Sequence, residues 1–411
     1  MPARVALLAG PTTYRGGAFL EAASRLGLEV LRVVDTPAEL VSDRQGQWLE
    51  LDFAAQDAAI AALRRSHACE PFAAVVALDD SATMLAAYTA AELHLPHNDP
   101  DAALAARSKW VMREALFRGG VPVPLYRQVA LDDDPLPAAL EIGFPVVVKP
   151  TTLSGSRGVI RADNPPELQA AFARARDIVF AAGEGDLLLE RYLPGVEVAL
   201  EGLLTAGRLQ TLAIFDKPDP LHGPFFEETI YVTPSRLPLD VQGAISARTA
   251  EAAAALGLRE GPVHAELRIN DDGIWLIEMA GRSIGGLCST VLEFGAGISL
   301  EEVILRHAVG MTLPASTRMA HAAGVMMIPI PRGGVLRGVT GTEAAVAVSG
   351  VTGVDITAPL HQPLVPLPEG ASYLGFIFAQ GSTPDEVEEA LRDAHAALAF
   401  QIDPAISLRI A

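Results

Sequence analysis

The chain carries an ordered series of charged residues whose types suit the handling of a nucleoside triphosphate. Lysine and arginine side chains neutralise phosphate oxygens, and small sets of carboxylates bind the magnesium ion that accompanies such phosphates. No single member decides a function, but their order and local settings predict chemistry on a triphosphate. The series comprises Lys109, Lys149, Glu190, Glu197, Glu266, Glu278 and Arg282.

Lys149 ends a short apolar run and is followed by a loop of small residues. Residues 146–150 (Val-Val-Val-Lys-Pro) predict a buried strand, and the loop at 154–158 reads Ser-Gly-Ser-Arg-Gly. Glycine lets the backbone approach phosphate oxygens, and serine hydroxyls and amide groups donate hydrogen bonds to them. Such a loop alone is usually only a flexible connection. Its place after a lysine-terminated strand predicts instead that Ser154, Gly155 and Ser156 bind phosphate.

Two glutamates flank a proline–glycine turn. Glu190 ends the apolar run at 187–189, and Glu197 follows seven residues later. The linker between them, with Arg191 and Leu193, has backbone groups that could hydrogen-bond the edge of an adenine base. Either carboxylate could accept from a ribose hydroxyl or the adenine amine. Two solvated glutamates beside a turn are the alternative, and this stretch alone does not separate the two interpretations.

The segments 264–269 and 274–280 predict a hairpin with a three-residue loop, Asp271-Asp272-Gly273, whose glycine takes the left-handed position. That register places Glu266 opposite Glu278, with Cβ atoms ~4.5–5.5 Å apart. Two facing carboxylates destabilise a sheet unless a positive charge lies between them, and Mg²⁺ is the natural candidate. The alternative, in which both splay into solvent, conflicts with the apolar run just before Glu278. The hairpin therefore predicts a metal site.

Arg282 follows Glu278 by four positions and precedes the pair Gly285-Gly286. An arginine beyond a metal carboxylate can steady a γ-phosphate, an acyl phosphate or a tetrahedral oxyanion. The two glycines allow a ligand to approach closely. The alternative is an ordinary surface salt bridge between Arg282 and Glu278. The one candidate for a general base is His264, although a lone histidine is more often structural.

Short apolar runs alternate with helical segments over the first hundred residues. Strands at 5–9, 30–34 and 73–78, with a helix at 17–26, predict a parallel α/β sheet. The turn after the first strand lacks G-x-G-x-x-G, and such turns more often shape a corner than bind phosphate. Because ligands favour the carboxyl ends of parallel strands, Thr12 and Asp79 could line a substrate entrance.

The remaining chain predicts three further parts. A helix at 101–117 carries Lys109 and stops at a glycine pair. A compact unit at about 121–190, with a strand, a loop, a helix and a second strand, looks like a lid subdomain, and a mixed sheet follows it. The last part combines apolar runs with a helix at 384–398. The predicted fold is α/β (α+β), with domains at 1–100, 101–310 and 311–411.

The amino-acid composition limits which classes of molecule the protein can bind. The chain has 411 residues, 50% of them apolar, and a formal net charge of −19, which repels nucleic acid and anionic membranes. Cys69 and Cys288 are too few for a disulfide framework, which fits a reducing cytosol. The amino-terminal apolar run is too short for a signal peptide, and no stretch reaches the ~20 apolar residues of a membrane span. We therefore expect a cytoplasmic protein with small-molecule substrates.

Together these residues resemble the ATP-grasp superfamily over nearly the whole chain. The likeness rests on residues 107–109 with 120–122, on 148–150 with the Ser-Gly-Ser loop, on 190–197, and on Glu266, Glu278 and Arg282. Within the superfamily, the segment 216–229 (Asp-Lys-Pro through Glu-Glu-Thr) and the Leu-Gly-Phe-Ile sequence at 374–377 resemble the L-amino-acid ligase branch, which makes dipeptides. Many other members of the superfamily carry asparagine at the position of Ala280. Alanine at this position is found in amino-acid ligases.

The resemblance implies an ATP-grasp fold in which ATP lies between two subdomains. It puts Lys109 and Lys149 on phosphates, Glu190 and Glu197 on the nucleoside, and Glu266 and Glu278 on Mg²⁺, with Mn²⁺ as an alternative. It implies further that Glu228 binds the ammonium of the amino-terminal amino acid, near Arg282, Gly285 and Gly286.

The implied reaction joins two amino acids through an acyl phosphate and releases ADP and phosphate. Two alternatives stay open, a bicarbonate-activating carboxylase and a non-catalytic ATP-binding protein. A homodimer is compatible with the resemblance.

Overall fold

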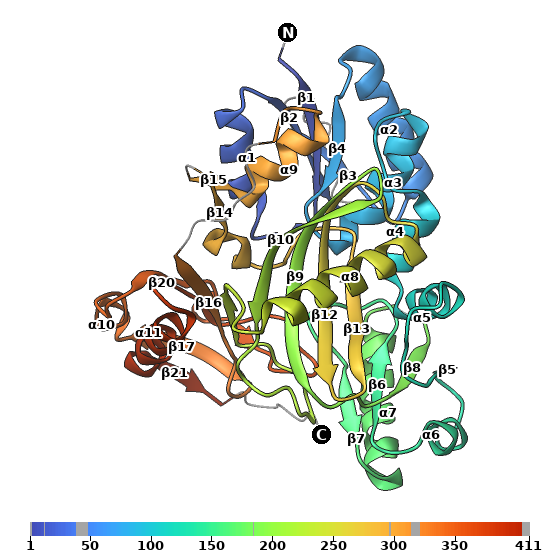
Figure 1. Ribbon diagram of the computed structural model, residues 1–411, viewed down its shortest axis with the longest axis vertical. Coiled ribbons are helices and arrows are strands. Elements are labelled where there is room, and N and C mark those ends of the chain that lie inside the picture. The colour runs from blue at the N-terminus through green and yellow to red at the C-terminus, as the bar shows by residue number, and fades with distance from the viewer. Residues whose placement is uncertain are drawn as a thin grey trace, which may run out of the picture.

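The computed structural model describes residues 2–11, 13–37, 48–183, 185–295, 297–313 and 321–404. It has the α/β architecture that the sequence predicted, with a parallel sheet, a long central sheet and a separate lid sheet. The prediction that the central sheet is mixed is wrong, because all of its strand pairs are antiparallel. Figure 1 shows the amino-terminal part at the top, the lid at the lower right and the carboxyl-terminal part at the left. None of the helices in these ranges is both long and apolar enough to cross a bilayer.

The amino-terminal part is a four-stranded parallel sheet in the order β3-β2-β1-β4. Its central strand β1 is almost wholly apolar and buried, as expected for a parallel strand covered on both faces. The prediction of a parallel sheet is confirmed, although strand β3 and helix α2 were not foreseen. Its elements are β1 (Arg4–Ala9), α1 (Gly16–Arg25), β2 (Glu29–Asp35), β3 (Trp48–Leu51), α2 (Gln56–Cys69), β4 (Ala74–Ala77), the 3₁₀ turn η2 (Asp80–Ala82) and α3 (Thr83–Glu92).

The single helix predicted at 101–117 is wrong, because the chain forms two helices, α4 (Pro100–Arg107) and α5 (Lys109–Arg118). Ser108 between them is extended, with φ −103° and ψ 116°, and its hydroxyl accepts from the amide of Val111. Serine is a strong N-cap, so the break starts a new helix rather than ending the helical region. Lys109 therefore lies at a helix amino terminus.

The lid is a four-stranded antiparallel sheet in the order β5-β8-β6-β7. Helix α7 packs against β6 and β7, and Val146, Val148, Leu187 and Leu189 belong to the apolar core between them. The buried strand β6 carries Lys149 near its end, as predicted. The lid elements are β5 (Tyr126–Val129), α6 (Leu136–Ile142), β6 (Val146–Pro150), β7 (Ile160–Ala162), α7 (Pro165–Ala181) and β8 (Leu187–Arg191).

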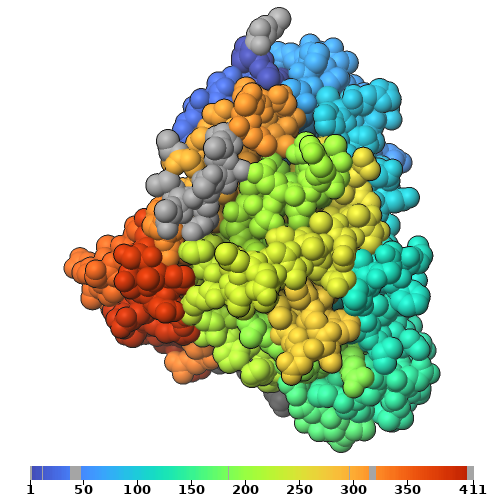
Figure 2. Space-filling model, viewed as in Figure 1, coloured from blue at the N-terminus to red at the C-terminus, as the bar shows by residue number. Residues whose placement is uncertain are grey.

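An eight-stranded sheet runs through the middle of the molecule in the order β13-β12-β9-β10-β11-β16-β20-β18. Helix α8 packs on one face of it and lies in front of the sheet in Figures 1 and 2. Alternate side chains such as Val198, Ala265 and Leu267 form the core beneath α8, so their neighbours point to the opposite face. The elements are β9 (Val196–Thr205), β10 (Arg208–Asp216), β11 (Ile230–Thr233), α8 (Leu239–Leu256), β12 (Gly261–Asn270) and β13 (Gly273–Ala280).

The carboxyl-terminal strands extend this central sheet. Strands β16, β20 and β18 continue it, while β19, β17 and β21 form a three-stranded sheet of their own. Helix α9 packs against α1 of the amino-terminal part. The domain boundaries at 100 and 310 stay predictions. The elements are η3 (Cys288–Val291), β14 (Glu293–Phe294), β15 (Ile298–Ser299), α9 (Leu300–Ala308), β16 (Ala322–Ile328), β17 (Gly334–Thr340), α10 (Thr342–Val346), β18 (Val351–Ile356), β19 (Pro363–Leu364), β20 (Gly375–Gly381), α11 (Pro384–Ala397) and β21 (Ala399–Asp403).

Candidate active site

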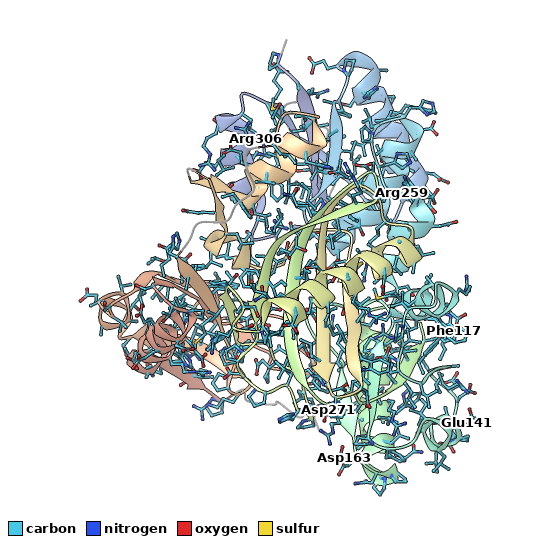
Figure 3. The ribbon with its side chains drawn as sticks, viewed as in Figure 1. Phe117, Glu141, Asp163, Arg259, Asp271 and Arg306 are labelled. Atoms are coloured by element: carbon cyan, nitrogen blue, oxygen red, sulfur yellow. The ribbon has the colours of Figure 1, made fainter. Side chains whose placement is uncertain are left out.

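Strands β12 and β13 pair so that Glu266 lies directly opposite Glu278, as predicted. The predicted three-residue loop is wrong, because Gly273 pairs with Asn270 and only two residues form the turn, whose Asp271 lies at the hairpin tip in Figure 3. A one-residue shift of register just after Glu266 compensates for the shorter loop. The two glutamates are therefore opposed even though the turn differs.

A cavity of about 70 Å³ lies between the lid sheet and the face of the central sheet opposite α8. Ligand cavities usually measure about 300–1,000 Å³, so this space has to widen before a nucleotide can enter. Residues predicted to bind nucleotide, metal or substrate supply more than half of its lining. They are Lys109, Lys149, Ser156, Glu190, Arg191, Leu193, Glu197, Glu228, Glu266 and Glu278.

The lysines predicted to hold phosphates are both buried beside this cavity. The Nζ of Lys109 donates to the carbonyl of Leu153 at 2.8 Å and lies 3.2 Å from Oε1 of Glu278. The Nζ of Lys149 lies 2.6 Å from Oε2 of Glu190. Burial lowers the pKa of Lys149, an effect that the charge of Glu190 opposes.

Glu190 is bound on both carboxylate oxygens. Nε of Arg113 lies 2.6 Å from Oε1, and Lys149 occupies Oε2. Burial alone would raise the pKa of Glu190, but Arg113 and Lys149 outweigh it and lower the pKa to about 2. Glu190 therefore serves first as the anion that orients Lys149, and its contact with a nucleoside stays a prediction.

Glu197 is likewise held by two cations. Lys217 Nζ lies 2.8 Å from Oε1, and Arg268 Nε lies 2.7 Å from Oε2. Arg268 stands directly opposite Glu197 on neighbouring strands, where opposite charges stabilise a sheet. Its Nη1 donates to the carbonyl of Leu193 at 2.7 Å. The linker predicted to meet adenine is therefore fixed by Arg268.

Three carboxylates surround the ammonium of Lys217. Besides Glu197, Lys217 forms an ion pair with Glu228, and its Nζ lies 3.5 Å from Oε1 of Glu266. Burial and the charge of Glu266 raise the pKa of Glu228 to about 7, although Lys217 opposes this. Within the described ranges, oxygens of these three glutamates lie within 4.8 Å of one another, and Glu278 is outside that group.

His264 lies between two carboxylates rather than beside open space. Its Nδ1 is 2.6 Å from Oε1 of Glu201, and its Nε2 is 3.5 Å from Oε1 of Glu266. Burial favours the neutral ring, but the hydrogen bonds to Glu201 and Glu266 prevail and raise its pKa to about 9. A histidine that is protonated at neutral pH is no general base, so the candidate role of His264 is not supported.

Arg282 forms a two-pronged ion pair with Asp80 of the amino-terminal part. Nε lies 2.9 Å from Oδ1 and Nη2 lies 2.6 Å from Oδ2, and both side chains are largely buried. Burial opposes the charge of Arg282, yet Asp80 raises its pKa above the ordinary value. The alternative of a surface salt bridge to Glu278 is therefore wrong.

The other predicted site residues lie at the edges. Ser154 and Gly155 belong to the lid loop but do not line the cavity, and Gly155 faces Ala371 of the carboxyl-terminal part. Arg282, Gly285 and Gly286 do not line the cavity either. Gly286 has φ +60°. Thr12 lies outside the described residues, and Asp79 accepts from the amide of Gly10 at 2.9 Å and from the hydroxyl of Ser81 at 2.6 Å.

Four charged residues of the site were missed or passed over. Arg113 lies four residues after Lys109, one helical turn along the same face, and Arg268 lies two residues after Glu266 on the same face of a strand. Both spacings could have been found in the sequence. Lys217 stood in a quoted motif without a role, and Asp80 lies 202 positions from its partner Arg282.

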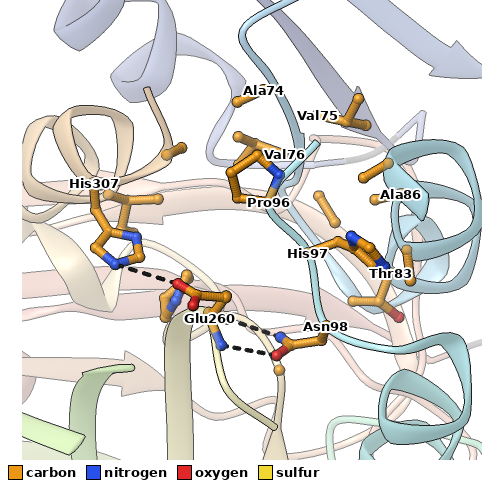
Figure 4. Close-up of a pocket in the computed structure, with 18 of the residues that line it drawn as sticks. Ala74, Val75, Val76, Thr83, Ala86, Pro96, His97, Asn98, Glu260 and His307 are labelled. Carbon is orange, nitrogen blue, oxygen red and sulfur yellow. Dashed lines mark hydrogen bonds and ion pairs between the residues drawn. The ribbon is translucent and has the colours of Figure 1, made fainter. Parts of the chain in front are cut away.

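A second cavity, of about 600 Å³, lies between strand β4 and the helices α3, α4 and α9 (Figure 4), and Asp80 is one of its lining residues. Small apolar side chains such as Ala74, Val76 and Ala86 form much of its wall. Some of its polar groups bond to one another: Asn98 donates to the carbonyl of Glu260 at 2.8 Å, and Nε2 of His307 lies 2.9 Å from Thr205 Oγ1. Lys109, Lys149, Glu266 and Glu278 are not among its lining residues, so it is separate from the first cavity.

Comparison with known families agrees with this geometry. Residues 142–291 match the ATP-grasp domain, residues 20–97 the ATP-grasp N-terminal domain, and residues 326–403 the L-amino acid ligase C-terminal domain 2. The chain belongs to the ATP-grasp superfamily and is a ligase that uses ATP.

The individual relatives of this chain are named as ligases. The crystal structure of an L-amino acid ligase from Bacillus licheniformis matches with a TM-score of 0.82 and 25% identity, over 98% of this chain and 99% of that one. A D-alanine–D-alanine ligase of Aromatoleum aromaticum is 32% identical over 43% of this chain and 57% of its own length. An alanine–anticapsin ligase of Bacillus subtilis is 28% identical over 50% and 47%. The chain thus spans about half the length of these two curated relatives.

Proposed function

We propose that the protein joins two amino acids in an ATP-dependent reaction that releases ADP and phosphate. The observation that carries the proposal is the convergence of Lys109 and Lys149 with the opposed pair Glu266 and Glu278 in one cavity. The L-amino acid ligase C-terminal domain at 326–403 supports an amino acid as substrate. The relatives named as D-alanine–D-alanine and alanine–anticapsin ligases support the same class of product.

In this proposal the lid loop and the two lysines hold the nucleotide. Lys109 and Lys149 neutralise phosphates, and the loop residues Ser154, Gly155 and Ser156 donate to phosphate oxygens once the lid has closed. The linker residues Arg191 and Leu193 lie along the adenine, with Glu197 on the nucleoside. Glu190 contributes by holding Lys149 at 2.6 Å.

Glu266 and Glu278 are the residues that would hold Mg²⁺ or Mn²⁺. Their chemistry fits, because both are carboxylates, both line the cavity, and each already lies near a positive group, His264 or Lys217 for Glu266 and Lys109 for Glu278. A bound Mg²⁺ would neutralise charge on the phosphate oxygens.

The reaction proceeds in two transfers. An oxygen of the first amino acid's carboxylate attacks the γ-phosphorus, and ADP leaves to give an acyl phosphate. The neutral amine of the second amino acid then attacks the acyl carbon, the bond from that carbon to the phosphate oxygen breaks, and the proton lost by the nitrogen leaves with the phosphate. Arg282 stabilises the oxyanion of the second step, with Gly285 and Gly286 beside the substrate and Glu228 on the ammonium of the first amino acid.

Release of ADP with single and paired amino acids, and with bicarbonate, tests the proposal. We expect turnover that needs amino acids, and dipeptide detectable by mass spectrometry. Turnover with bicarbonate alone would favour a carboxylase, and no ADP from any mixture would favour a non-catalytic ATP-binding protein. Either result would overturn the proposal. Glu278→Ala and Arg282→Ala should abolish the amino-acid-dependent ADP release.

The partners follow from the same proposal. Small molecules are the substrates, and neither nucleic acid nor membrane is involved. A cytoplasmic location and a homodimer are part of the proposal, and sedimentation velocity of the purified protein tests the second.

A further inference from the structure

Lysine is rare in this chain. Of its 31 lysines and arginines only three are lysines, at positions 109, 149 and 217. All three are buried, with 8%, 8% and 6% of their surface exposed. Two of them face the nucleotide cavity, and the third lies among carboxylates that line it. Since arginine supplies every other fixed positive side chain, lysine is retained only where a compact, buried ammonium sits at the active site.

The surroundings of Lys217 suit an ammonium and not a guanidinium. Its Nζ makes ion pairs with three separate carboxylates, those of Glu197, Glu228 and Glu266. The ring of Tyr231 lies on another side, with its centroid 5.0 Å from the nitrogen. An ammonium has three donors that can serve three carboxylates, whereas the flat fork of arginine matches the two oxygens of one.

Glu228 depends on Lys217 more than the other two glutamates do. Glu197 has Arg268 as a second cation, and Glu266 has His264. Among the residues that the structure describes, Lys217 is the only ion-pair partner of Glu228. Glu228 also lines the cavity, so one side of its carboxylate is held by Lys217 while another part borders the space for ligands.

We propose that Lys217 is a positioning residue for recognition of the amino acid that is activated. Its ammonium fixes Glu228 so that this carboxylate meets the α-ammonium of the substrate, and through Glu266 it links that position to the metal side of the site. The inference rests on the proposed function and adds to it the residue that sets the affinity for the first amino acid. Lys217 acts through Glu228 and does not touch the reacting atoms.

Kinetics of matched variants test this role. For Lys217→Met we expect the KM of the first amino acid to rise about 10- to 100-fold, while the Kd of ATP changes little. Lys149→Met provides the contrast, because it should weaken ATP binding first. Lys217→Arg should fail to rescue Lys217→Met. In a Glu228→Gln background, Lys217→Met should add little further loss, since an amide needs no counter-ion.

The three lysines also allow a direct readout without turnover. Enzyme labelled with ¹³C in its lysine side chains should give three sets of signals, and the set missing from Lys217→Met identifies residue 217. The amino acid to add is the one that gives the most ADP release in the turnover assay. When it is added together with a non-hydrolysable ATP analogue, the signal of Lys217 should shift more than the signals of Lys109 and Lys149. The two remaining signals in Lys217→Met should match those of the wild type, which shows that the site is still folded.

The outcomes separate this inference from the proposed function. If the wild type ligates amino acids but Lys217→Met keeps the wild-type KM, or the Lys217 signal ignores the amino acid, the positioning role is wrong and the ligase function stands. Full rescue by Lys217→Arg would also overturn it. If no amino acid drives ADP release from the wild type, the proposed function fails, and this inference fails with it.

Discussion

The guanidinium of Arg282 is clamped by the carboxylate of Asp80, at 2.9 and 2.6 Å, and the two residues come from different parts of the chain. Asp80 begins the 3₁₀ turn after β4, and Arg282 follows the end of β13. Two parallel N–H···O bonds fix the plane of the guanidinium as well as its position. The amino-terminal sheet therefore sets the orientation of the arginine that we assign to the oxyanion.

Replacing Asp80 by asparagine should loosen Arg282 without removing it. We expect kcat to fall about 10- to 100-fold, less than for loss of an oxyanion donor itself, with the Kd of ATP nearly unchanged. Steady-state kinetics and a binding titration measure the two quantities. Asp79→Asn is the control, because Asp79 bonds to Gly10 and Ser81 instead of an arginine. Equal losses in both variants would mean that the turn, and not the ion pair, matters.

The buried triad of Glu190, Arg113 and Lys149 should make stability depend on acid pH. The pKa of Glu190 is about 2, below its ordinary 4.5, so its ionised form stabilises the fold above pH ~4.5. That contribution is lost as the pH falls toward 2. Glu190→Gln leaves two buried cations without an anion and should cost about 3–5 kcal/mol at pH 7.

Urea unfolding at pH 7, 5 and 3.5 measures this effect. The difference in unfolding free energy between wild type and Glu190→Gln should shrink toward the lowest pH. Glu141→Gln removes an exposed lid carboxylate that pairs with Arg127 at 3.0 Å, and it should show no such trend. A constant difference for Glu190→Gln across the range would contradict the assignment.

The sequence predicted the opposed glutamates because strand pairing is local. A short loop and the alternation of side chains along a strand leave few residues that could lie opposite Glu266. The prediction contained two errors, a loop one residue too long and a missed register shift, and they cancel at Glu278. The break at Ser108 was not foreseen, because serine occurs inside helices too. What selects the break is tertiary: the amide of Lys109 donates to the carbonyl of Thr151 at 2.7 Å.

Long-range partners were beyond the reach of local patterns. Nothing near Asp80 indicates that it meets Arg282, and nothing near Glu197 indicates that Lys217 and Arg268 hold both of its oxygens. Spacing could still identify Arg113 and Arg268, since each shares a face with a residue already chosen. The sequence therefore located most of the charged groups at the site but left open how they pair.

The pKa of His264 predicts a loss of stability in mild alkali. Its pKa of about 9 lies above the ordinary 6.5, so protonated His264 stabilises the fold below pH ~6.5. This contribution disappears as the pH rises through 9, and it is on the order of 3 kcal/mol. Chemical unfolding from pH 6 to 9.5 should show the loss in the wild type and not in His264→Asn. His361→Asn, which removes an exposed histidine, should behave as the wild type; an identical slope for His264→Asn would refute the prediction.

The lid contacts the carboxyl-terminal part through the last two residues of the lid loop 154–158. The amide of Gly158 donates to the carbonyl of Pro368 at 2.8 Å, and Nε of Arg157 donates to that of Glu369 at 2.9 Å. The carboxylate of Glu369 pairs with both prongs of Arg174 on α7. Opening the small cavity by moving the lid would break these contacts, so they favour the closed form.

Glu369→Ala should therefore shift the lid toward the open form. The ion pair between Arg174 and Glu369 is substantially exposed, which limits its worth to roughly 0.2–1 kcal/mol. We expect the Kd of ATP to rise only about two- to fivefold, and cleavage within loop 151–158 by a nonspecific protease to become faster. Arg176→Ala is the matched control, because Arg176 lies on the same helix but pairs with its neighbour Asp177. If Glu369→Ala left both quantities at the Arg176→Ala level, the ion pair between Arg174 and Glu369 would not help to hold the lid closed.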